Sequence, residues 1–492
     1  MRSMVEGFCR KAGYPSTTAF GSGPPPHRLR RQGGAVMTPL WTSAEIAEAT
    51  GGTANAAFEV TSVTFDSREV EPGSLFVAMP GTVHDGHSFV DAALAAGASG
   101  LIVSRPVDAP HVLVDDTARA LEALGRASRE RCGAKIVGVT GSVGKTSTKE
   151  ALYAALDRCA PGRVHRSVKS YNNHTGVPLS LARMPRKAAY AVLEMGMNNA
   201  GEIAALTRLV RPHVAIINAI APAHIENLGS EEAIADAKAE IFDGLEAGGV
   251  AILPNDTPHR DRLLKAARRH ADRIITFGHG DADVHALHAV RADQGGSLIT
   301  ASLLDSELTF TVSQRGDHWV SNALAVLAAV EALGADVALA GLALADMTGI
   351  KGRGQRRRVA VGGGEAVLID ESYNANPASM AATLKSLGAE RDVARRIAVL
   401  GPMRELGEHG AELHAGLARP ILDAGVDRLI LLGEEMRPLA ESLVGKVGLD
   451  LVFTLNEATD CLQSMLRPGD VVLVKASNSV GLAQLVERVA GA

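Results

Sequence analysis

The sequence predicts the α/β fold class, with the chain divided into three domains. Short apolar runs rich in Val, Ile and Leu alternate with helical segments from residue 38 onward, which is the pattern of mostly parallel strands joined by crossover helices. With 492 residues, the chain is long enough for about two to four domains. Apolar residues make up 46% of it, so large cores can be buried.

Residues 1–36 differ in composition from everything that follows. They hold six Lys or Arg side chains against one acid, together with a run of three prolines. They contain no apolar stretch of the kind that a secretory signal peptide needs. We expect a disordered tail, or an over-long start with Met37 as the true first residue; a basic targeting segment is the alternative.

Residues 37–118 predict a compact first domain. Ser74–Met79 and Gly100–Ser104 are apolar runs of strand length. A helical pattern over Glu45–Thr50 precedes both strands, and a second one over Asp91–Ala96 lies between them. This region therefore predicts a small sheet with helices packed on it.

Residues 119–348 predict a larger central domain on a mostly parallel sheet. Its Ala-rich segment Ala323–Ala345 carries Glu331 and Asp336, so it predicts a buried helix rather than a membrane span, which requires roughly 18–20 apolar residues. The strands expected here are Lys135–Thr140, Ala189–Glu194, His213–Asn218, Val250–Leu253 and Ile274–Phe277.

Residues 349–492 predict a third domain with its own parallel sheet. The polar, Gly-rich stretch 351–355 predicts the hinge that joins it to the central domain. The strands expected here are Ala366–Asp370, Arg396–Leu400, Arg428–Leu432 and Asp470–Lys475.

Charge and composition exclude several classes of function. A net charge of −5 and an aromatic content of 3% argue against a nucleic-acid-binding protein, which needs basic surfaces or stacking platforms. The four cysteines are widely scattered, which excludes a disulfide framework and a zinc ribbon and fits a reducing compartment. We therefore expect a cytoplasmic protein with no membrane span and no nucleic-acid partner.

The strongest local signal is a short phosphate loop after the first central strand, of the form T-G-x-x-G-K-T. Backbone N–H groups of such a loop cradle phosphates at a helix N-terminus, while its Lys reaches the β- and γ-phosphates and its Thr hydroxyl binds Mg²⁺. The loop predicts ATP binding by Gly141, Ser142, Val143, Gly144, Lys145, Thr146 and Ser147.

Other polar residues follow strands, where open α/β sheets place their ligand crevices. Glu194 ends an apolar strand and could hold Mg²⁺ beside the loop, or it could be a surface acid. His224 comes shortly after the third central strand. Asp370 and Lys475 stand at strand ends in the third domain. These positions predict a functional cleft between two sheets.

Two further polar clusters have both a structural and a functional interpretation. The segment Asp66-Ser67-Arg68 and His87 in the first domain suit a diphosphate or a ribose, although turns alone could explain them. The run from Asp370 to Met380, which includes Tyr373, Asn374 and Asn376, concentrates groups that are costly to bury unpaired. It predicts either a loop network or a ligand surface.

Taken together, the motifs resemble those of the Mur ligase family from about Thr38 to the C-terminus. The segments that carry the resemblance are FDSREVEPGSLFVAMPG, DGHSFVDAALAAGA, TGSVGKTSTKE, YNNHTGVPLSL, LEMGMNNAGEI, APAHIENLGS, AKAEIF, HWVSNALAV, GRGQR, DESYNANPASM, GPMRELGEHG and VLVKASNS. The resemblance implies a small α/β uridine-nucleotide-binding domain, a central phosphate-loop ATPase domain and a C-terminal Rossmann-like domain.

The resemblance also implies roles for individual residues. Lys145 and Thr146 would bind the ATP phosphates and the first of two Mg²⁺ ions, and Glu194 would be shared by both ions. His224 would help to hold the second ion, and Lys238 falls on the carbamylated lysine of the family; from its place on an acidic helix alone, Lys238 would be a solvated side chain. The catalytic set implied is Lys145, His224 and Lys238. The remaining contacts implied are Asn322, Arg353 and Asp370 with ATP; Asp66, Ser67, Arg68 and His87 with the UDP substrate; and Tyr373, Asn374, Asn376, Lys475 and Ser477 on the peptide side.

The activity implied is ATP-dependent amide-bond formation between UDP-MurNAc-tripeptide and D-Ala-D-Ala in peptidoglycan precursor synthesis. It proceeds through an acyl phosphate, and we expect a monomer. One alternative is a ligase of the same family that adds another amino acid. A second is a nucleotide switch or ATP-driven binding protein, which would turn over ATP without a carboxylate and an amine.

Overall fold

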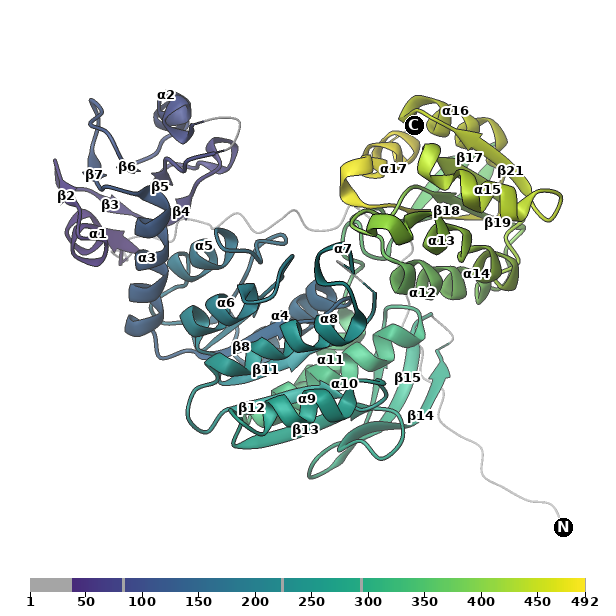
Figure 1. Ribbon diagram of the computed structural model, residues 1–492, viewed down its shortest axis with the longest axis horizontal. Helices are drawn as coiled ribbons and strands as arrows, with labels where there is room; N and C mark the ends of the chain where they lie inside the picture. The colour runs from purple at the N-terminus through teal and green to yellow at the C-terminus, as the bar shows by residue number, and fades with distance from the viewer. Residues whose placement is uncertain (1–37, 82–84, 223–224, 293–294, 492) are drawn as a thin grey trace, which may run out of the picture. The chain divides into compact units, whose positions relative to one another are not determined.

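The computed structural model describes residues 38–81, 85–222, 225–292 and 295–491 (Figure 1). Within these residues three larger sheets of five, nine and six strands and one two-stranded sheet are formed. Each larger sheet lies inside one of the three sequence ranges expected for a domain. The α/β fold class is therefore confirmed, while the domain boundaries stay predictions. The N-terminal tail and His224 lie outside the described residues.

The first sheet has the strand order β2-β7-β6-β5-β4, in which β4 to β7 are parallel. Helix α1 (Ser43–Thr50) begins two residues earlier than the sequence predicts, because Thr42 and Glu45 form a capping box. Helix α2 (Val90–Ala95) matches the second predicted helix closely. The strands are β1 (Trp41–Thr42), β2 (Thr53–Ala54), β3 (Glu59–Val60), β4 (Ser62–Thr64), β5 (Ser74–Val77), β6 (Gly100–Val103) and β7 (His111–Leu113).

The central sheet has the order β16-β15-β14-β13-β12-β11-β8-β10-β9. All five predicted strands are present. The neighbouring strands β14, β13, β12, β11, β8, β10 and β9 run parallel to one another. The antiparallel extension β14 to β16 was not predicted. The strands are β8 (Lys135–Thr140), β9 (Val164–Arg166), β10 (Tyr190–Glu194), β11 (Val214–Ile217), β12 (Val250–Pro254), β13 (Arg273–Gly278), β14 (Val284–Arg291), β15 (Ser297–Ser302) and β16 (Glu307–Val312).

Helices cover both faces of the central sheet and bury two separate apolar cores. Val137 and Val139 of β8 pack toward α4 and α10, whereas Ile136 packs toward α6 and α8, as the alternation of side chains along a strand requires. The helices are α3 (Thr117–Arg131), α4 (Lys145–Cys159), α5 (Gly176–Ala182), α6 (Glu202–Val210), α7 (Ile225–Leu228), α8 (Glu231–Ala239), α9 (Arg260–Ala267), α10 (Asp317–Ala332) and α11 (Val337–Asp346).

The Ala-rich segment is buried over Ala323–Val330 and only partly buried beyond it, and the prediction of a single helix is wrong. Helix α10 ends before Gly334, whose φ of +71° is in the left-handed region, and Asp336 caps the start of α11. Glycine adopts that conformation without a steric penalty, which permits the turn between the two helices. None of the described helices combines the length and the apolar character needed to cross a bilayer.

The third sheet has the order β17-β18-β22-β19-β20-β21. Strands β18, β22, β19, β20 and β21 run parallel to one another, and the edge strand β17 is antiparallel to β18. The predicted strands are confirmed, and β17, which begins at the end of the expected hinge stretch, is an addition. The strands are β17 (Gln355–Val361), β18 (Gly364–Glu371), β19 (Arg395–Leu400), β20 (Arg428–Leu432), β21 (Gly448–Val452) and β22 (Asp470–Lys475). The helices are α12 (Pro377–Gly388), α13 (Gly410–Ala415), α14 (Ala418–Asp423), α15 (Arg437–Leu443), α16 (Leu455–Met465) and α17 (Leu482–Ala490).

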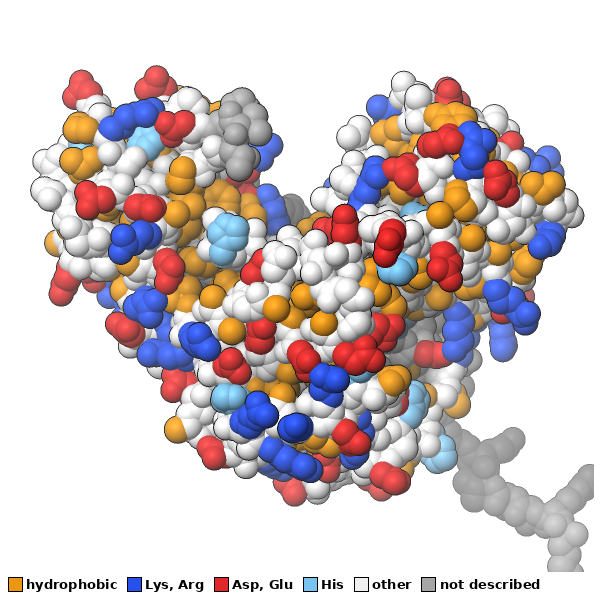
Figure 2. All heavy atoms as spheres, viewed as in Figure 1, with side chains coloured by type: hydrophobic (Ala, Val, Ile, Leu, Met, Phe, Trp, Pro, Cys, Tyr) orange, Lys and Arg blue, Asp and Glu red, His pale blue; other side chains and the backbone are white. Residues whose placement is uncertain are grey.

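The described surface carries charges of both signs. On the face shown in Figure 2, Lys and Arg side chains are interspersed with Asp and Glu rather than gathered into a continuous basic stripe. A protein that follows a phosphate backbone presents such a stripe.

Candidate active site

The phosphate loop connects the end of β8 to the start of α4. Gly141 has a φ of +149° and Gly144 a φ of +84°, which only glycine adopts readily. A Cβ on Gly144 would also lie 2.7 Å from the amide nitrogen of Asn218 and 2.8 Å from the amide oxygen of Asn322. Both glycines are thus needed for the loop to place backbone N–H groups at the start of a 15-residue helix, where an anion binds favourably.

One cavity of about 430 Å³ joins this loop to the C-terminal sheet. Its walls come from the phosphate loop, the ends of β10 and β11, α10, and the segments that follow Lys351 and β18. The predicted residues that line it are Ser142, Val143, Gly144, Lys145, Thr146, Ser147, Glu194, Asn322, Arg353, Tyr373, Asn374, Asn376 and Lys475. The expectation that two sheets face a common cleft is therefore met in the described residues.

Glu194 is a buried carboxylate whose two oxygens are both held. Thr146 Oγ1 donates to its Oε2 at 2.8 Å, and Asn172 Nδ2 donates to its Oε1 at 2.8 Å. Its side chain is only 1% exposed but borders the cavity. No cluster of three or more His, Cys, Asp or Glu that could bind a metal occurs among the described residues. A carboxylate and a hydroxyl facing a phosphate site nevertheless fit Mg²⁺, which takes few protein ligands and fills its sphere with phosphate and water.

Lys145 lies on the wall of the cavity, and its Nζ donates to the carbonyl of Gly141 at 2.7 Å. Burial lowers the pKa of Lys145, the Glu194 carboxylate raises it in part, and Arg353 lowers it. The negative charge of an anion bound in the cavity would stabilise the ammonium group and offset the cost of its burial. The loop lysine is thus placed to gain from a bound phosphate.

Lys238 is 1% exposed on α8 and is not among the residues that line the cavity. Burial, and then the positive charge of Lys145, lower the pKa of Lys238 well below its ordinary value, and no described carboxylate raises it. The sequence interpretation as a solvated helix residue is therefore wrong. A neutral buried amine is the form that can add CO₂, so the carbamate implied by the family remains a prediction that this environment favours.

On the C-terminal side, two cations border the cavity. The Arg353 guanidinium lies over the Tyr373 ring at 4.5 Å from its centroid, which fixes its position by a cation–π contact. Lys475 Nζ donates to the carbonyl of Asn374 at 2.8 Å, and its ammonium is 3.5 Å from Glu371. Three positive side chains, including Lys145, therefore point toward one site.

Three of the predicted ATP and peptide contacts lie outside the cavity lining, namely Gly141, Asp370 and Ser477. The Asp370 carboxylate accepts hydrogen bonds from the backbone N–H groups of Gly352 and Ser372 and from the Ser372 hydroxyl. It thereby holds the turn that carries Arg353. Ser477 Oγ accepts from the N–H of Arg404 at 2.9 Å. Their direct contacts with ATP and with the peptide stay predictions.

The residues expected to bind the UDP substrate also lie away from this cavity. Arg68 forms a bidentate pair with Asp66 at 2.7 and 2.8 Å, and this hydrogen bonding holds the pKa of Asp66 at about 2. Both ring nitrogens of His87 are used, one with Asp85 and the other as acceptor from Ser104 N–H. His87 thus supports its loop, while Arg68 projects outward with its side chain 87% exposed and Ser67 lies between the pair.

Some lining residues were not singled out from the sequence. Asn172 belongs to a polar run of residues after β9. The adjacent amide side chains in that run were the only sequence signal that could have indicated a ligand-binding role. Asn218 follows β11 directly, in the position where other functional residues were expected, and its Nδ2 donates to Thr148 and Asn322 beneath the loop. His318 and Trp319 at the start of α10 also line the cavity; they belong to the segment HWVSNALAV, which carries part of the family resemblance, but no role was predicted for either residue.

Three family models match this chain in succession. They are described as the Mur ligase family catalytic domain at residues 59–130, the Mur ligase middle domain at residues 139–330, and the Mur ligase glutamate ligase domain at residues 352–478. Each match overlaps one of the three larger sheets.

Relatives and solved structures cover almost the whole chain. The UDP-N-acetylmuramoyl-tripeptide–D-alanyl-D-alanine ligase of Bacillus subtilis is 35% identical over 91% of this chain and 97% of its own length. The ligase of that name from Escherichia coli is 33% identical over 88% and 94%. A crystal structure of MurF from Acinetobacter baumannii superposes with a TM-score of 0.80 at 30% identity, covering 92% of this chain and 99% of that one. MurF ligase from Thermotoga maritima in complex with ADP gives a TM-score of 0.72 at 28% identity, covering 87% and 97%. The chain belongs to the Mur ligase family.

Proposed function

We propose that this chain is an ATP-dependent ligase that joins the carboxylate of UDP-MurNAc-tripeptide to the amine of D-Ala-D-Ala in peptidoglycan precursor synthesis. The observation that carries the proposal is the single cavity lined by the phosphate loop, by Glu194 and by Arg353 and Lys475 of the C-terminal part. The names and high coverage of the relatives support this substrate pair.

The reaction requires two anions to meet. The peptide carboxylate attacks the γ-phosphorus of ATP, ADP leaves, and the amine then attacks the acyl phosphate and displaces inorganic phosphate as it loses a proton. Lys145 and Arg353 supply positive charge where the phosphoryl group moves, and loop N–H groups orient it. Lys475, Tyr373 and Asn374 border the same space and are proposed to hold the peptide side.

Two Mg²⁺ ions are proposed as cofactors beside ATP. Thr146 and Glu194 would hold them, with His224 and carbamylated Lys238 completing the protein ligands. Bound there, Mg²⁺ would neutralise phosphate charge. Hard oxygen donors buried next to the phosphate loop support this assignment.

We assign UDP binding to residues 37–118, ATP binding to 119–348 and closure of the site to 349–492. We also propose that the protein acts in the cytoplasm as a monomer. Cys132, Cys159 and Cys461 are free thiols, which supports a reducing compartment. Sedimentation measurements of the purified chain would check the monomer.

The decisive assay is coupled ADP release with UDP-MurNAc-tripeptide, with and without D-Ala-D-Ala. A ligase releases ADP in sustained turnover only when both substrates are present. A nucleotide switch would hydrolyse ATP equally well without them, which would contradict the proposal. A panel of amines in the same assay separates D-Ala-D-Ala from the single amino acids that other ligases of the family would add.

Substitution of the first-domain pair tests where the UDP substrate binds. We expect Asp66→Ala and Arg68→Ala each to raise KM for UDP-MurNAc-tripeptide by about 10-fold or more, the effect of losing a hydrogen bond to a charged group. KM for ATP should change much less, because both residues lie outside the ATP cavity. Arg119→Ala, at an exposed arginine of α3, is the control. If KM for ATP changed more than KM for UDP-MurNAc-tripeptide, the assignment of Asp66 and Arg68 to the UDP substrate would be wrong.

A further inference from the structure

The chain segment 167–172, between β9 and α5, contacts Glu194 from one side. Ser167 Oγ accepts from the backbone N–H of Glu194 at 3.2 Å, and Asn172 Nδ2 donates to the Glu194 carboxylate at 2.8 Å. The carbonyl of Asn172 also accepts from Gly196 N–H, just beyond β10. The position of Glu194 beside the phosphate loop therefore depends on where this segment lies.

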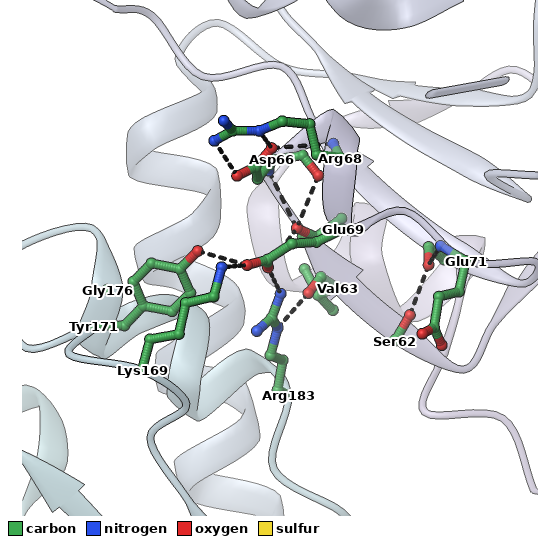
Figure 3. A network of polar contacts seen from close by, with 12 residues as sticks. Ser62, Val63, Asp66, Arg68, Glu69, Glu71, Lys169, Tyr171, Gly176 and Arg183 are labelled. Atoms are coloured by element: carbon green, nitrogen blue, oxygen red, sulfur yellow. Dashed lines mark hydrogen bonds and ion pairs between the residues drawn. The ribbon is translucent and has the colours of Figure 1, made fainter. Parts of the chain in front are cut away.

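Other residues of the same segment contact Glu69 of the first domain (Figure 3). Lys169 Nζ and the Tyr171 hydroxyl both donate to Glu69 Oε1, the hydroxyl at 3.0 Å. Arg183, from the residue after α5, donates to Oε2 at 3.1 Å. The Tyr171 ring also packs against Phe65 with centroids 5.6 Å apart. The Glu69 carboxylate therefore connects the segment to the first domain through these hydrogen bonds.

Lys149 holds the segment at its centre and connects it to the metal site. The side chain of Lys149 is fully buried, and its Nζ donates to the carbonyl of Lys169 at 2.7 Å. The same ammonium is 4.0 Å from Glu194 Oε2 and 3.1 Å from Glu150. A continuous series of contacts therefore runs from Glu69 through Lys169 and Lys149 to Glu194.

The backbone at Lys169 depends on these contacts. Its φ of +50° lies in the left-handed region, a strained conformation that a lysine keeps only where its surroundings impose it. Its carbonyl is fixed by Lys149 and its ammonium by Glu69. Loss of the Glu69 carboxylate should therefore allow the segment to relax.

We infer that Glu69 is a positioning residue that couples the uridine-nucleotide site to the Glu194 site through the 167–172 segment. Glu69 is the last residue of the 3₁₀ helix η1 (Ser67–Glu69), which also carries Arg68 and is capped by Asp66. A ligand that orders this helix therefore also orders the support of Glu194. The inference rests on the proposed function, because it assumes that a uridine nucleotide binds at η1 and ATP with Mg²⁺ at Glu194.

Coupling of this kind is reciprocal and can be measured as a ratio of affinities. We would determine by calorimetry the Kd of a non-hydrolysable ATP analogue with Mg²⁺, with and without UDP-MurNAc-tripeptide. In the unsubstituted protein the tripeptide nucleotide should tighten analogue binding by about fivefold or more, the lower end for coupled sites. In Glu69→Gln this ratio should fall toward one.

Control variants separate coupling from general damage. Glu71→Gln removes a nearby exposed carboxylate and should keep the full ratio. Lys169→Met removes the other end of the ion pair and should lose the ratio as Glu69→Gln does, with no further loss in the double variant. If Glu69→Gln does not fold, as judged by its melting transition, Lys169→Met alone decides the question.

An unchanged ratio in a folded Glu69→Gln or Lys169→Met protein would overturn the inference, as would a ratio of one in the unsubstituted protein. Failure of the proposed function would look different, because ADP release by the unsubstituted protein would then not depend on the presence of both UDP-MurNAc-tripeptide and D-Ala-D-Ala. A purely structural role for Glu69 would lower the melting temperature and leave the ratio intact.

Discussion

In the Lys145→Ala variant, the rate of substrate-dependent ADP release should fall by about 10³-fold or more, the scale for a cation that stabilises phosphoryl transfer. Lys145 is the cation of the phosphate loop itself, and its Nζ lies in the cavity wall beside the loop carbonyl of Gly141. Without it, the charge that develops on the moving phosphoryl group loses its nearest protein partner. Arg353 and Lys475 border the same cavity but come from the C-terminal sheet, so they cannot replace a group fixed at the helix start.

The fold of this variant should survive. The hydrogen bond from the Lys145 ammonium to the Gly141 carbonyl at 2.7 Å is worth about 0.5–1.5 kcal/mol, and the substitution also ends the burial of a cation. Circular dichroism and the melting temperature should therefore match those of the parent. Lys265→Ala, at an exposed lysine of α9, is the matched control and should keep full activity. Near-normal ADP release from folded Lys145→Ala would refute the assignment of the phosphate loop.

Strands buried on both faces were predictable because they are continuous apolar runs. Lys135–Thr140, Arg428–Leu432 and Asp470–Lys475 were predicted with the bounds that the structure gives. The antiparallel strands β14 to β16 were missed because they are only partly buried. Most of β14 is exposed, so its sequence mixes His, Arg and Ala and lacks the apolar signal of a parallel strand.

The candidate site was predictable where chemistry follows a strand directly. The phosphate loop, Glu194 and Lys475 all satisfy that rule, and the structure brings them to one cavity. Contacts between distant loops were not predictable. Glu69 and Lys169 are 100 residues apart, and nothing in either local sequence indicates that the two side chains meet.

Local chemistry also could not reveal surroundings that come from elsewhere in the chain. Asp370 carries the polarity of a ligand residue, yet the backbone groups it accepts from belong to Gly352 and Ser372. Lys238 follows acidic neighbours on a helix, yet tertiary packing buries it. This burial sets the electrostatic environment of the Lys238 amine. The spacing of residues along the helix could not reveal the burial, because the residues that cover Lys238 come from other parts of the chain.

That environment leads to the second large effect. In Lys238→Ala, the rate of ADP release should fall by about 100-fold or more, at or beyond the usual range for residues that support a metal site. The lysine is 1% exposed, and the pKa of its amine is lowered by burial and by Lys145. A lowered pKa enlarges the neutral, nucleophilic fraction of the amine, which is the form that adds CO₂ to give a carbamate. The substitution would remove that anion and leave a buried space of similar size.

Short carboxylic acids should restore part of the activity of Lys238→Ala, because acetate or propionate can place a carboxylate in the vacated space. ADP release would be measured against acid concentration, with chloride at equal ionic strength as the control for salt. The Lys145→Ala variant should show no such rescue, since its lost group is a cation. In the unsubstituted protein, ¹³C-labelled bicarbonate should give a carbamate signal that Lys238→Ala lacks. Equal stimulation by chloride and acetate, together with the absence of that signal, would show that Lys238 acts without carbamylation.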